Sequence, residues 1–204
     1  MTELALNCRT DRPAISRIHI DDSLAAMKLA TELYQRLSEA DLEAGRRPIV
    51  LLCIGTDRST GDALGPLVGS QLRRVGQNLF SVYGTLEEPV HATNLEQVIT
   101  EIQVKYQNPY IIAVDACLGN PENIGYVNIV NGPLKPGAGV KKTLPAVGEM
   151  HITGVVNVGG FMEYMILQST RLNIVMQIAN VIADGLKQTI YNHKQAAAAL
   201  DRRA

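Results

Sequence analysis

The chain has 204 residues, 46% of them hydrophobic, and a formal net charge of −1 from 19 basic and 20 acidic side chains. This length and apolar content suit one large globular domain, and we expect an N-terminal arm over residues 1–20 followed by a single α/β domain over residues 21–204. The balanced charge, without a charged block, argues against nucleic-acid or membrane binding through bulk electrostatics.

The cysteines and the N-terminus indicate the cellular compartment in which we expect the protein. Cys8, Cys53 and Cys117 are odd in number and widely spaced, which argues against a disulfide framework and indicates a reducing environment. The N-terminus has no apolar segment typical of a secretory signal, and no stretch reaches the ~18 apolar residues of a membrane helix. We therefore expect a cytoplasmic protein.

The first two predicted elements are a helix and a buried strand. From Asp21 onward, apolar residues recur at steps of three and four and fade near Gly45, which predicts a helix capped by Asp21 or Asp22. Residues 46–55 then form a continuous apolar run. Such a run is typical of a parallel strand covered on both faces of its sheet.

The elements that follow alternate between helical and extended patterns. The sequence predicts helices over residues 62–75, 94–106 and 162–200, and strands over residues 80–86, 109–119, 124–132 and 151–160. The last helical stretch is consistent with one long helix or with two helices that break near Ser169 and Thr170. This alternation predicts an α/β protein, a three-layer αβα sandwich with a mainly parallel central sheet.

Two acidic residues follow buried strands of the predicted sheet. Asp62 comes after the polar stretch that follows the first strand, and Asp115 ends the apolar run "YIIAVD". Because ligands bind at the carboxyl edge of open parallel sheets, we expect these carboxylates to lie close together there. Two adjacent carboxylates do not both ionise readily, so the pair can supply an acid and a base. A metal site, or separate roles as helix and turn caps, remain alternatives for the same residues.

Other candidate groups carry weaker signals. The Gly/Pro-rich stretch "KPGAGVKK", within the expected loop over residues 133–148, is consistent with an anion site of backbone N–H groups or with a mobile loop, and it lacks the glycine spacing of a P-loop. His151, close to Glu149, is consistent with a metal ligand, a proton carrier or a hydrogen-bonded structural histidine. Ser59 and Thr60 have no histidine base in view, so a serine nucleophile is not favoured.

Three motifs, taken in order, resemble those of a known family. "IGTDRSTGDALGPLVG", "YIIAVDACLG" and "LKPGAGVKK" are similar to the YyaC family of sporulation proteins, which is related to the spore germination protease and more distantly to hydrogenase maturation endopeptidases. The resemblance covers roughly residues 20 to 190. It implies the α/β fold of these peptidases and a location in the forespore or spore core.

The resemblance also implies an activity. It points to a sporulation-associated peptidase that hydrolyses peptide bonds through an aspartate pair, with small acid-soluble spore proteins as candidate substrates and with no cofactor and no metal ion. The candidate catalytic residues are Asp62 and Asp115, and the candidate substrate-binding residues are Asp57, Arg58, Ser59, Gly137 and Gly139.

The chain departs from the germination protease in ways that keep other functions open. It is much shorter and lacks the segments that close the substrate groove of that enzyme, which favours a non-catalytic binding or regulatory protein of spore formation as the alternative. A metal-sensing maturation peptidase, with His151 as third ligand, is a weaker alternative. An apolar stripe over residues 173–190 is also consistent with a homodimer.

Overall fold

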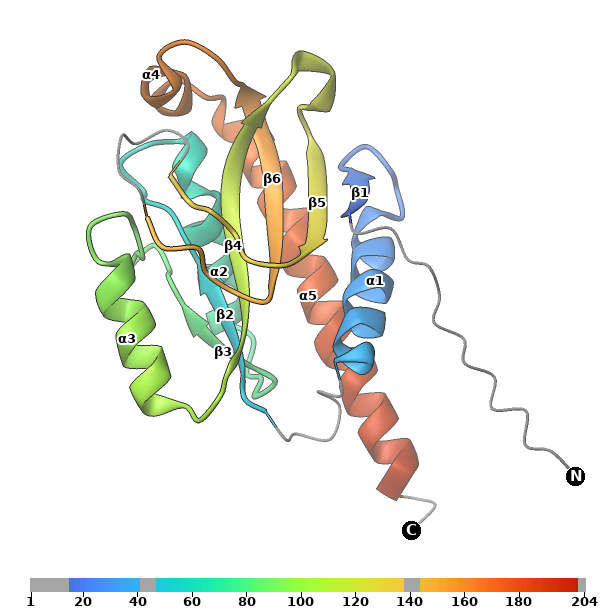
Figure 1. Ribbon diagram of the computed structural model, residues 1–204. Helices are drawn as coiled ribbons and strands as arrows, with labels where there is room; N and C mark the ends of the chain where they lie inside the picture. Colours follow the sequence, from blue (N-terminus) through green and yellow to red (C-terminus); the bar gives the residue numbers. More distant parts are fainter. Residues whose placement is uncertain (1–14, 41–46, 138–143, 202–204) are drawn as a thin grey trace, which may run out of the picture.

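The computed structural model describes residues 15–40, 47–137 and 144–201 (Figure 1). In chain order, the elements are β1 (Ile15–His19), α1 (Ala25–Glu39), β2 (Ile49–Cys53), η1 (Gly61–Ala63), α2 (Leu64–Arg73), β3 (Phe80–Tyr83), α3 (Leu95–Lys105), β4 (Tyr110–Gly119), η2 (Pro121–Asn123), β5 (Tyr126–Asn131), β6 (Met150–Val158), α4 (Glu163–Gln168) and α5 (Leu172–Asp201).

The strands form one six-stranded sheet in the order β1-β5-β6-β4-β2-β3. β2 pairs in parallel with β3 and with β4, and β4 pairs in parallel with β6. β5 runs antiparallel to both β6 and β1. The predicted α/β class with a mainly parallel central sheet is therefore confirmed.

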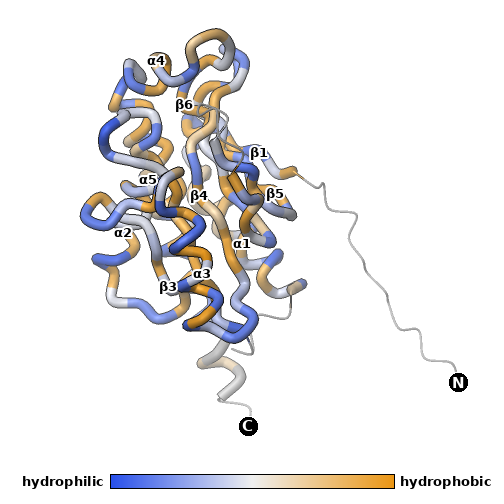
Figure 2. Tube along the Cα trace, turned by 60° about the vertical axis from the view of Figure 1, so that its left-hand side comes forward, coloured by the Kyte–Doolittle hydropathy of each residue, from blue (hydrophilic) through white to orange (hydrophobic). Residues whose placement is uncertain are grey.

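Helices cover the sheet on two faces, which gives the three layers that the sequence predicts. Side chains of α1, α2 and α5 pack on one face with Leu51 and Cys53 of β2, whereas α3 packs on the other face with Val50 and Leu52. Every residue of β2 is buried, as its continuous apolar run predicts. Figure 2 shows apolar segments, in orange, in both the helices and the strands.

The N-terminal arm is the main correction to the predicted architecture. Residues 15–19 are not an arm but form β1, an edge strand that pairs with β5 from Ile15↔Val130 to His19↔Tyr126. Ile18 packs into the core while its neighbours lie outside it, and Ser16 hydrogen-bonds to Glu32 and Arg36 of α1. Residues 1–14 lie outside the described residues.

The helix boundaries differ from the predicted ones for local reasons. Asp22 accepts a hydrogen bond from Leu24 N–H at 2.9 Å, and α1 begins just after this turn. The C-terminal helical stretch breaks at Ser169 and Thr170, one of the two predicted alternatives. Both hydroxyls donate to carbonyls of the preceding turn, Ser169 to Met165 and Thr170 to Ile166, each at 2.8 Å. No helix within the described ranges is long and apolar enough to cross a membrane.

Candidate functional site

Asp62 is held over the end of β2 by a tightly closed loop. Gly55 follows the strand with φ at +145°, and Thr56 N–H donates to the Asp62 carbonyl at 3.1 Å. A Cβ on Gly55 would lie 2.0 Å from that carbonyl oxygen, so only glycine allows the closure. The loop thereby returns Asp62 to the carboxyl edge of the sheet, in η1 at the entrance to α2.

η1 is also fixed from outside by α4. Gly61 lies against Leu167, where a Cβ would come within 2.7 Å of the Leu167 Cδ2 atom. Neither η1 nor α2 has a side-chain cap hydrogen bond, so the Asp62 carboxylate does not cap its own helix. The carboxylate is therefore available for other contacts, and the simple helix-cap alternative for this residue is not supported.

Asp115 lies on β4, the strand next to β2. Ile112 and Val114 face the core beneath α5, and Ala113 faces α3. Because side chains alternate along a strand, Asp115 lies on the same face as Ala113, at the carboxyl end. Its Oδ1 accepts a hydrogen bond from Ala116 N–H at 2.8 Å. Because β2 and β4 are parallel neighbours, Asp62 and Asp115 both lie at the carboxyl edge of the sheet.

The electrostatics of the two carboxyls are unequal. The pKa of Asp115 is raised to about 8. Burial is the main cause, the Ala116 N–H opposes it, and the charge of Asp62 adds a smaller increase. Burial also raises the pKa of Asp62, and the Ser59 hydroxyl lowers it. Asp115 carries the larger shift and keeps a proton at neutral pH, whereas Asp62 ionises first.

The structure does not bring the predicted substrate-binding residues together within the described ranges. Asp57 and Arg58 are exposed on the loop that precedes η1, and Ser59 is buried beside Asp62. Ser59 is near enough to influence the pKa of Asp62, yet its Oγ makes no hydrogen bond of normal geometry within the described ranges. Gly137 is half-buried with φ at +93°, and no described contact joins it to the carboxyls. Gly139 lies outside the described residues.

Two further residues, which the sequence alone did not assign, surround Asp115. Thr153 of β6 is its direct partner in the strand register, and Cys117 follows two positions later on β4. Burial raises the pKa of Cys117, the Thr153 hydroxyl lowers it, and the charge of Asp115 raises it. Only the β4–β6 register reveals Thr153. In the sequence it is an isolated polar residue within an apolar strand.

His151 has a structural contact. Its Nδ1 hydrogen-bonds to the Gly132 carbonyl at 2.8 Å, which ties the start of β6 to the end of β5. Across residues 15–40, 47–137 and 144–201, no group of three or more His, Cys, Asp and Glu side chains is arranged to hold a metal ion.

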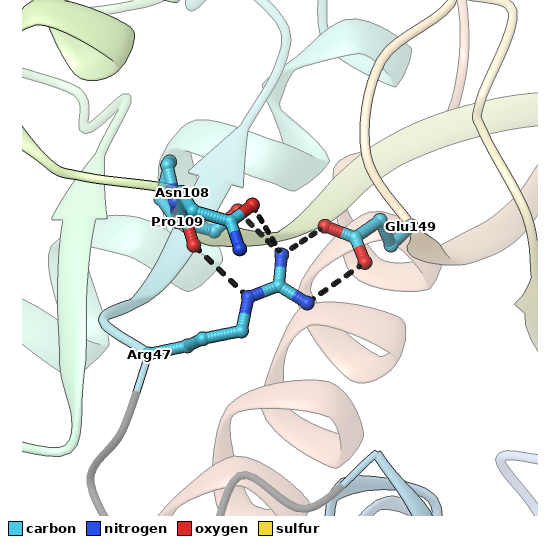
Figure 3. Close-up of polar contacts among 4 residues, drawn as sticks. All are labelled: Arg47, Asn108, Pro109 and Glu149. Carbon is cyan, nitrogen blue, oxygen red and sulfur yellow. Dashed lines mark hydrogen bonds and ion pairs between the residues drawn. The ribbon is translucent and has the colours of Figure 1, made fainter.

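The opposite, amino edge of the sheet is closed by Arg47 (Figure 3). Its guanidinium binds both Glu149 carboxylate oxygens, at 2.6 and 3.2 Å, and donates to the carbonyls of Asn108 and Pro109. A cavity of about 350 Å³ lies beside it. Its lining residues are Gln103, Tyr106, Asn108, Pro109, Ile111, Gly148 and Glu149. This cavity is at the far edge from Asp62 and Asp115.

The amino-acid sequence shows the family to which this chain belongs. Residues 17–185 match the family described as "Protein of unknown function (DUF1256)", and the chain is a member of it. Over 168 residues it is 56% identical to the uncharacterized protein YyaC of Bacillus subtilis (strain 168), a match that spans 82% of this chain and 80% of that protein. The resemblance to the YyaC family, predicted from three motifs, is confirmed.

Two solved structures are similar to part of the chain. The hydrogenase 3 maturation protease is 15% identical, with a TM-score of 0.43, and the match covers 68% of this chain and 88% of that one. The [NiFe] hydrogenase maturation protease HycI from Thermococcus kodakarensis KOD1 is 19% identical, with a TM-score of 0.44, over 72% of this chain and 97% of that one.

Proposed function

We propose that this protein is a sporulation-associated peptidase of the germination-protease type, in which Asp62 and Asp115 activate water for attack on a peptide bond. Its proposed substrates are small acid-soluble spore proteins, and its proposed location is the forespore or spore core. The membership of the YyaC family and the motifs that carry Asp62 and Asp115 support this proposal.

One observation carries the chemistry: the pKa of Asp115 is raised to about 8, mainly by burial and to a smaller extent by the charge of Asp62. At neutral pH such a pair holds one proton and one negative charge. The Asp62 carboxylate accepts a proton from water as the water oxygen attacks the carbonyl carbon. The Asp115 carboxyl donates a hydrogen bond to the carbonyl oxygen, and a proton then passes to the leaving amine.

The test is cleavage of purified small acid-soluble spore proteins by wild type, Asp62→Asn and Asp115→Asn. Loss of either member of the pair should reduce kcat by roughly 10²- to 10⁴-fold, the usual contribution of a positioned acid or base. Asp184→Asn is the matched control, because Asp184 is exposed on α5 and pairs only with Lys187 among the described contacts. Equal activity of all four proteins would exclude the pair as the catalytic groups.

The second candidate is a non-catalytic binding or regulatory protein that keeps the peptidase fold. The position of the 350 Å³ cavity supports it, because this cavity lies at the Arg47 edge and not beside the carboxyls. Under this alternative, the spore proteins bind without being cut. Calorimetric binding that survives Asp62→Asn but is lost in Glu149→Gln would favour the second candidate over the first.

A further inference from the structure

The face of the sheet that carries Asp115 has no helix on it beyond α3 within the described ranges, although Thr153, next to Asp115, is itself buried. α3 packs on this face over β2 and the start of β4, and Leu134 and Val147 pack there beside it. Over β6, β5 and β1 no helix of the described ranges lies on it, and in Figure 1 β6 and β5 stand in front of α5. Asn128 and Tyr126 are partly exposed there and Arg17 is exposed. A polar sheet surface therefore adjoins the candidate catalytic carboxyls.

Strand register arranges four polar side chains in one row across this surface. Asp115 of β4 stands opposite Thr153 of β6, Thr153 opposite Asn128 of β5, and Asn128 opposite Arg17 of β1. Asn128 Nδ2 donates to Thr153 Oγ1 at 3.3 Å, and Arg17 Nε donates to Asn128 Oδ1 at 3.2 Å. The row leads from a candidate catalytic carboxyl to a guanidinium at the edge of the sheet.

Arg17 is a cation whose described partners are all neutral. Besides Asn128, its Nη2 donates to Asn123 Oδ1 at 2.7 Å, and its guanidinium lies 4.4 Å from the centre of the Tyr126 ring. No ion pair of Arg17 is found within the described ranges. A guanidinium has five N–H donors, so three of them lack a described partner and face an exposed surface. Such a group is suited to a planar anion, which it can bind through two parallel hydrogen bonds.

We propose that an extended peptide binds across β4, β6, β5 and β1, and that Arg17 holds a carboxylate of this peptide. The inference rests on the proposed function, because Asp115 then marks the bond that is cut. Neighbouring strands are ~4.8 Å apart, so three spacings separate Asp115 from Arg17 by about 14 Å. Since an extended chain advances ~3.3 Å per residue, the carboxylate belongs about four residues from the scissile bond. It is either an acidic side chain or the carboxyl terminus of the substrate.

The test measures binding separately from cleavage. The probes are fluorescein-labelled decapeptides in which a single Glu is moved through every position, with a matched Gln series, each made with a free and with an amidated C-terminus. Fluorescence anisotropy with the Asp62→Asn protein gives Kd without turnover. We expect one Glu position to bind about ten- to a hundredfold more tightly than its Gln counterpart. If the terminal carboxylate is the ligand, the free C-terminus should show that preference over the amide instead.

Variants of Arg17 assign the effect to this side chain. Arg17→Gln should abolish the carboxylate preference, Arg17→Lys should keep part of it, and Arg17→Glu should reverse it in favour of Lys at the same position. Arg74→Gln is the control, because Arg74 is exposed at the end of α2 and loses the same charge. Circular dichroism and thermal unfolding show whether each variant is folded.

The outcomes separate this inference from the proposed function. If wild type binds the carboxylate through Arg17 but cleaves nothing, the proposed peptidase activity is wrong and the proposed peptide site stands. If Arg17→Gln cleaves substrate as wild type does, the proposed peptide site is wrong and the proposed peptidase activity stands. An Arg17→Gln protein that retains the preference, or a wild type that binds no probe at millimolar concentration, would overturn the inference.

Discussion

Gly55 lies so close to Asp62 that a Cβ at position 55 would be 2.0 Å from the Asp62 carbonyl oxygen. The backbone of Gly55 also has φ at +145°, a conformation that side chains of L-residues rarely adopt. The turn after β2 and the position of the candidate base therefore depend on the same missing side chain. This coupling connects the stability of the fold to the geometry of the site.

We expect Gly55→Ala to lower the free energy of unfolding by about 1–3 kcal/mol, because the new methyl group strains the backbone and displaces the Asp62 carbonyl. Urea unfolding followed by circular dichroism measures the change. Gly76→Ala is the control, since a Cβ there would meet nothing within 4 Å, and its effect should stay close to zero. Equal midpoints for the two variants would contradict the argued closure of the loop.

The pH dependence of stability should report the buried carboxyl of Asp115. In the folded protein its pKa is about 8, against an ordinary value of 3.8, so unfolding releases a proton between these pH values. Wild type should therefore lose stability as the pH rises from about 4 to about 8. Asp115→Asn should not lose stability in this way. Its free energy of unfolding should therefore rise relative to that of wild type by up to about 1.4 kcal/mol per pH unit in that range.

Denaturant unfolding at a series of pH values measures the difference, which should level off below pH 4 and above pH 8. Asp184→Asn, an exposed aspartate variant, should follow the wild-type curve in parallel. A constant difference between wild type and Asp115→Asn across the whole range would show that Asp115 ionises normally in the folded protein.

The interaction between the two carboxyls has a direct spectroscopic test. Since the charge of Asp62 raises the pKa of Asp115, Asp62→Asn should lower the pKa of Asp115 below its wild-type value of about 8. Carboxyl ¹³C chemical shifts, titrated by NMR in wild type and variant, measure the change. An unaltered Asp115 titration would mean that the two groups do not interact and would remove the basis for shared acid–base chemistry.

Arg36 joins α1 to two strands inside the protein. Its guanidinium, 2% exposed, pairs with Glu32 at 3.1 Å and donates to Asn131 at 2.6 Å and to Ser16 at 2.9 Å. Removing a buried cation from such a set leaves its partners unsatisfied. We expect Arg36→Ala to lower the free energy of unfolding by about 3–5 kcal/mol.

The exposed ion pair of Arg73 and Glu88 serves as the control for the buried contacts of Arg36. Arg73 and Glu88 lie 2.8 Å apart, but both side chains are largely exposed, so Arg73→Ala should cost less than about 1 kcal/mol. Thermal and urea unfolding of both variants provide the measurement. An Arg36→Ala protein as stable as Arg73→Ala would show that the buried contacts of Arg36 contribute little.

Sequence patterns predicted the parts of this fold that depend on local chemistry. The apolar run of β2, the helical spacing that follows Asp62 and the apolar end of β4 at Asp115 are each readable within a few residues. The position of the two aspartates at one edge follows from the general rule for parallel sheets. It needed only that β2 and β4 be neighbours, which the strand order bears out.

The row from Asp115 to Arg17 was beyond sequence reasoning. It exists because the β4–β6, β6–β5 and β5–β1 registers align, and each register depends on contacts between distant segments. β1 itself was mistaken for an arm, since five residues with a single core side chain resemble a loose segment until their partner is known. Arg17, with no partner in view, gave no local signal.

β1 also has a consequence for the outer edge of the sheet. It pairs with β5 from Tyr126 to Val130, so the backbone donors and acceptors of this part of β5 are covered. A protein shortened to begin at α1 would leave this row of amide groups unpaired and open to a strand from another molecule. Loss of β1 is therefore a route to aggregation, even though Ile18 is the one side chain of this strand in the hydrophobic core.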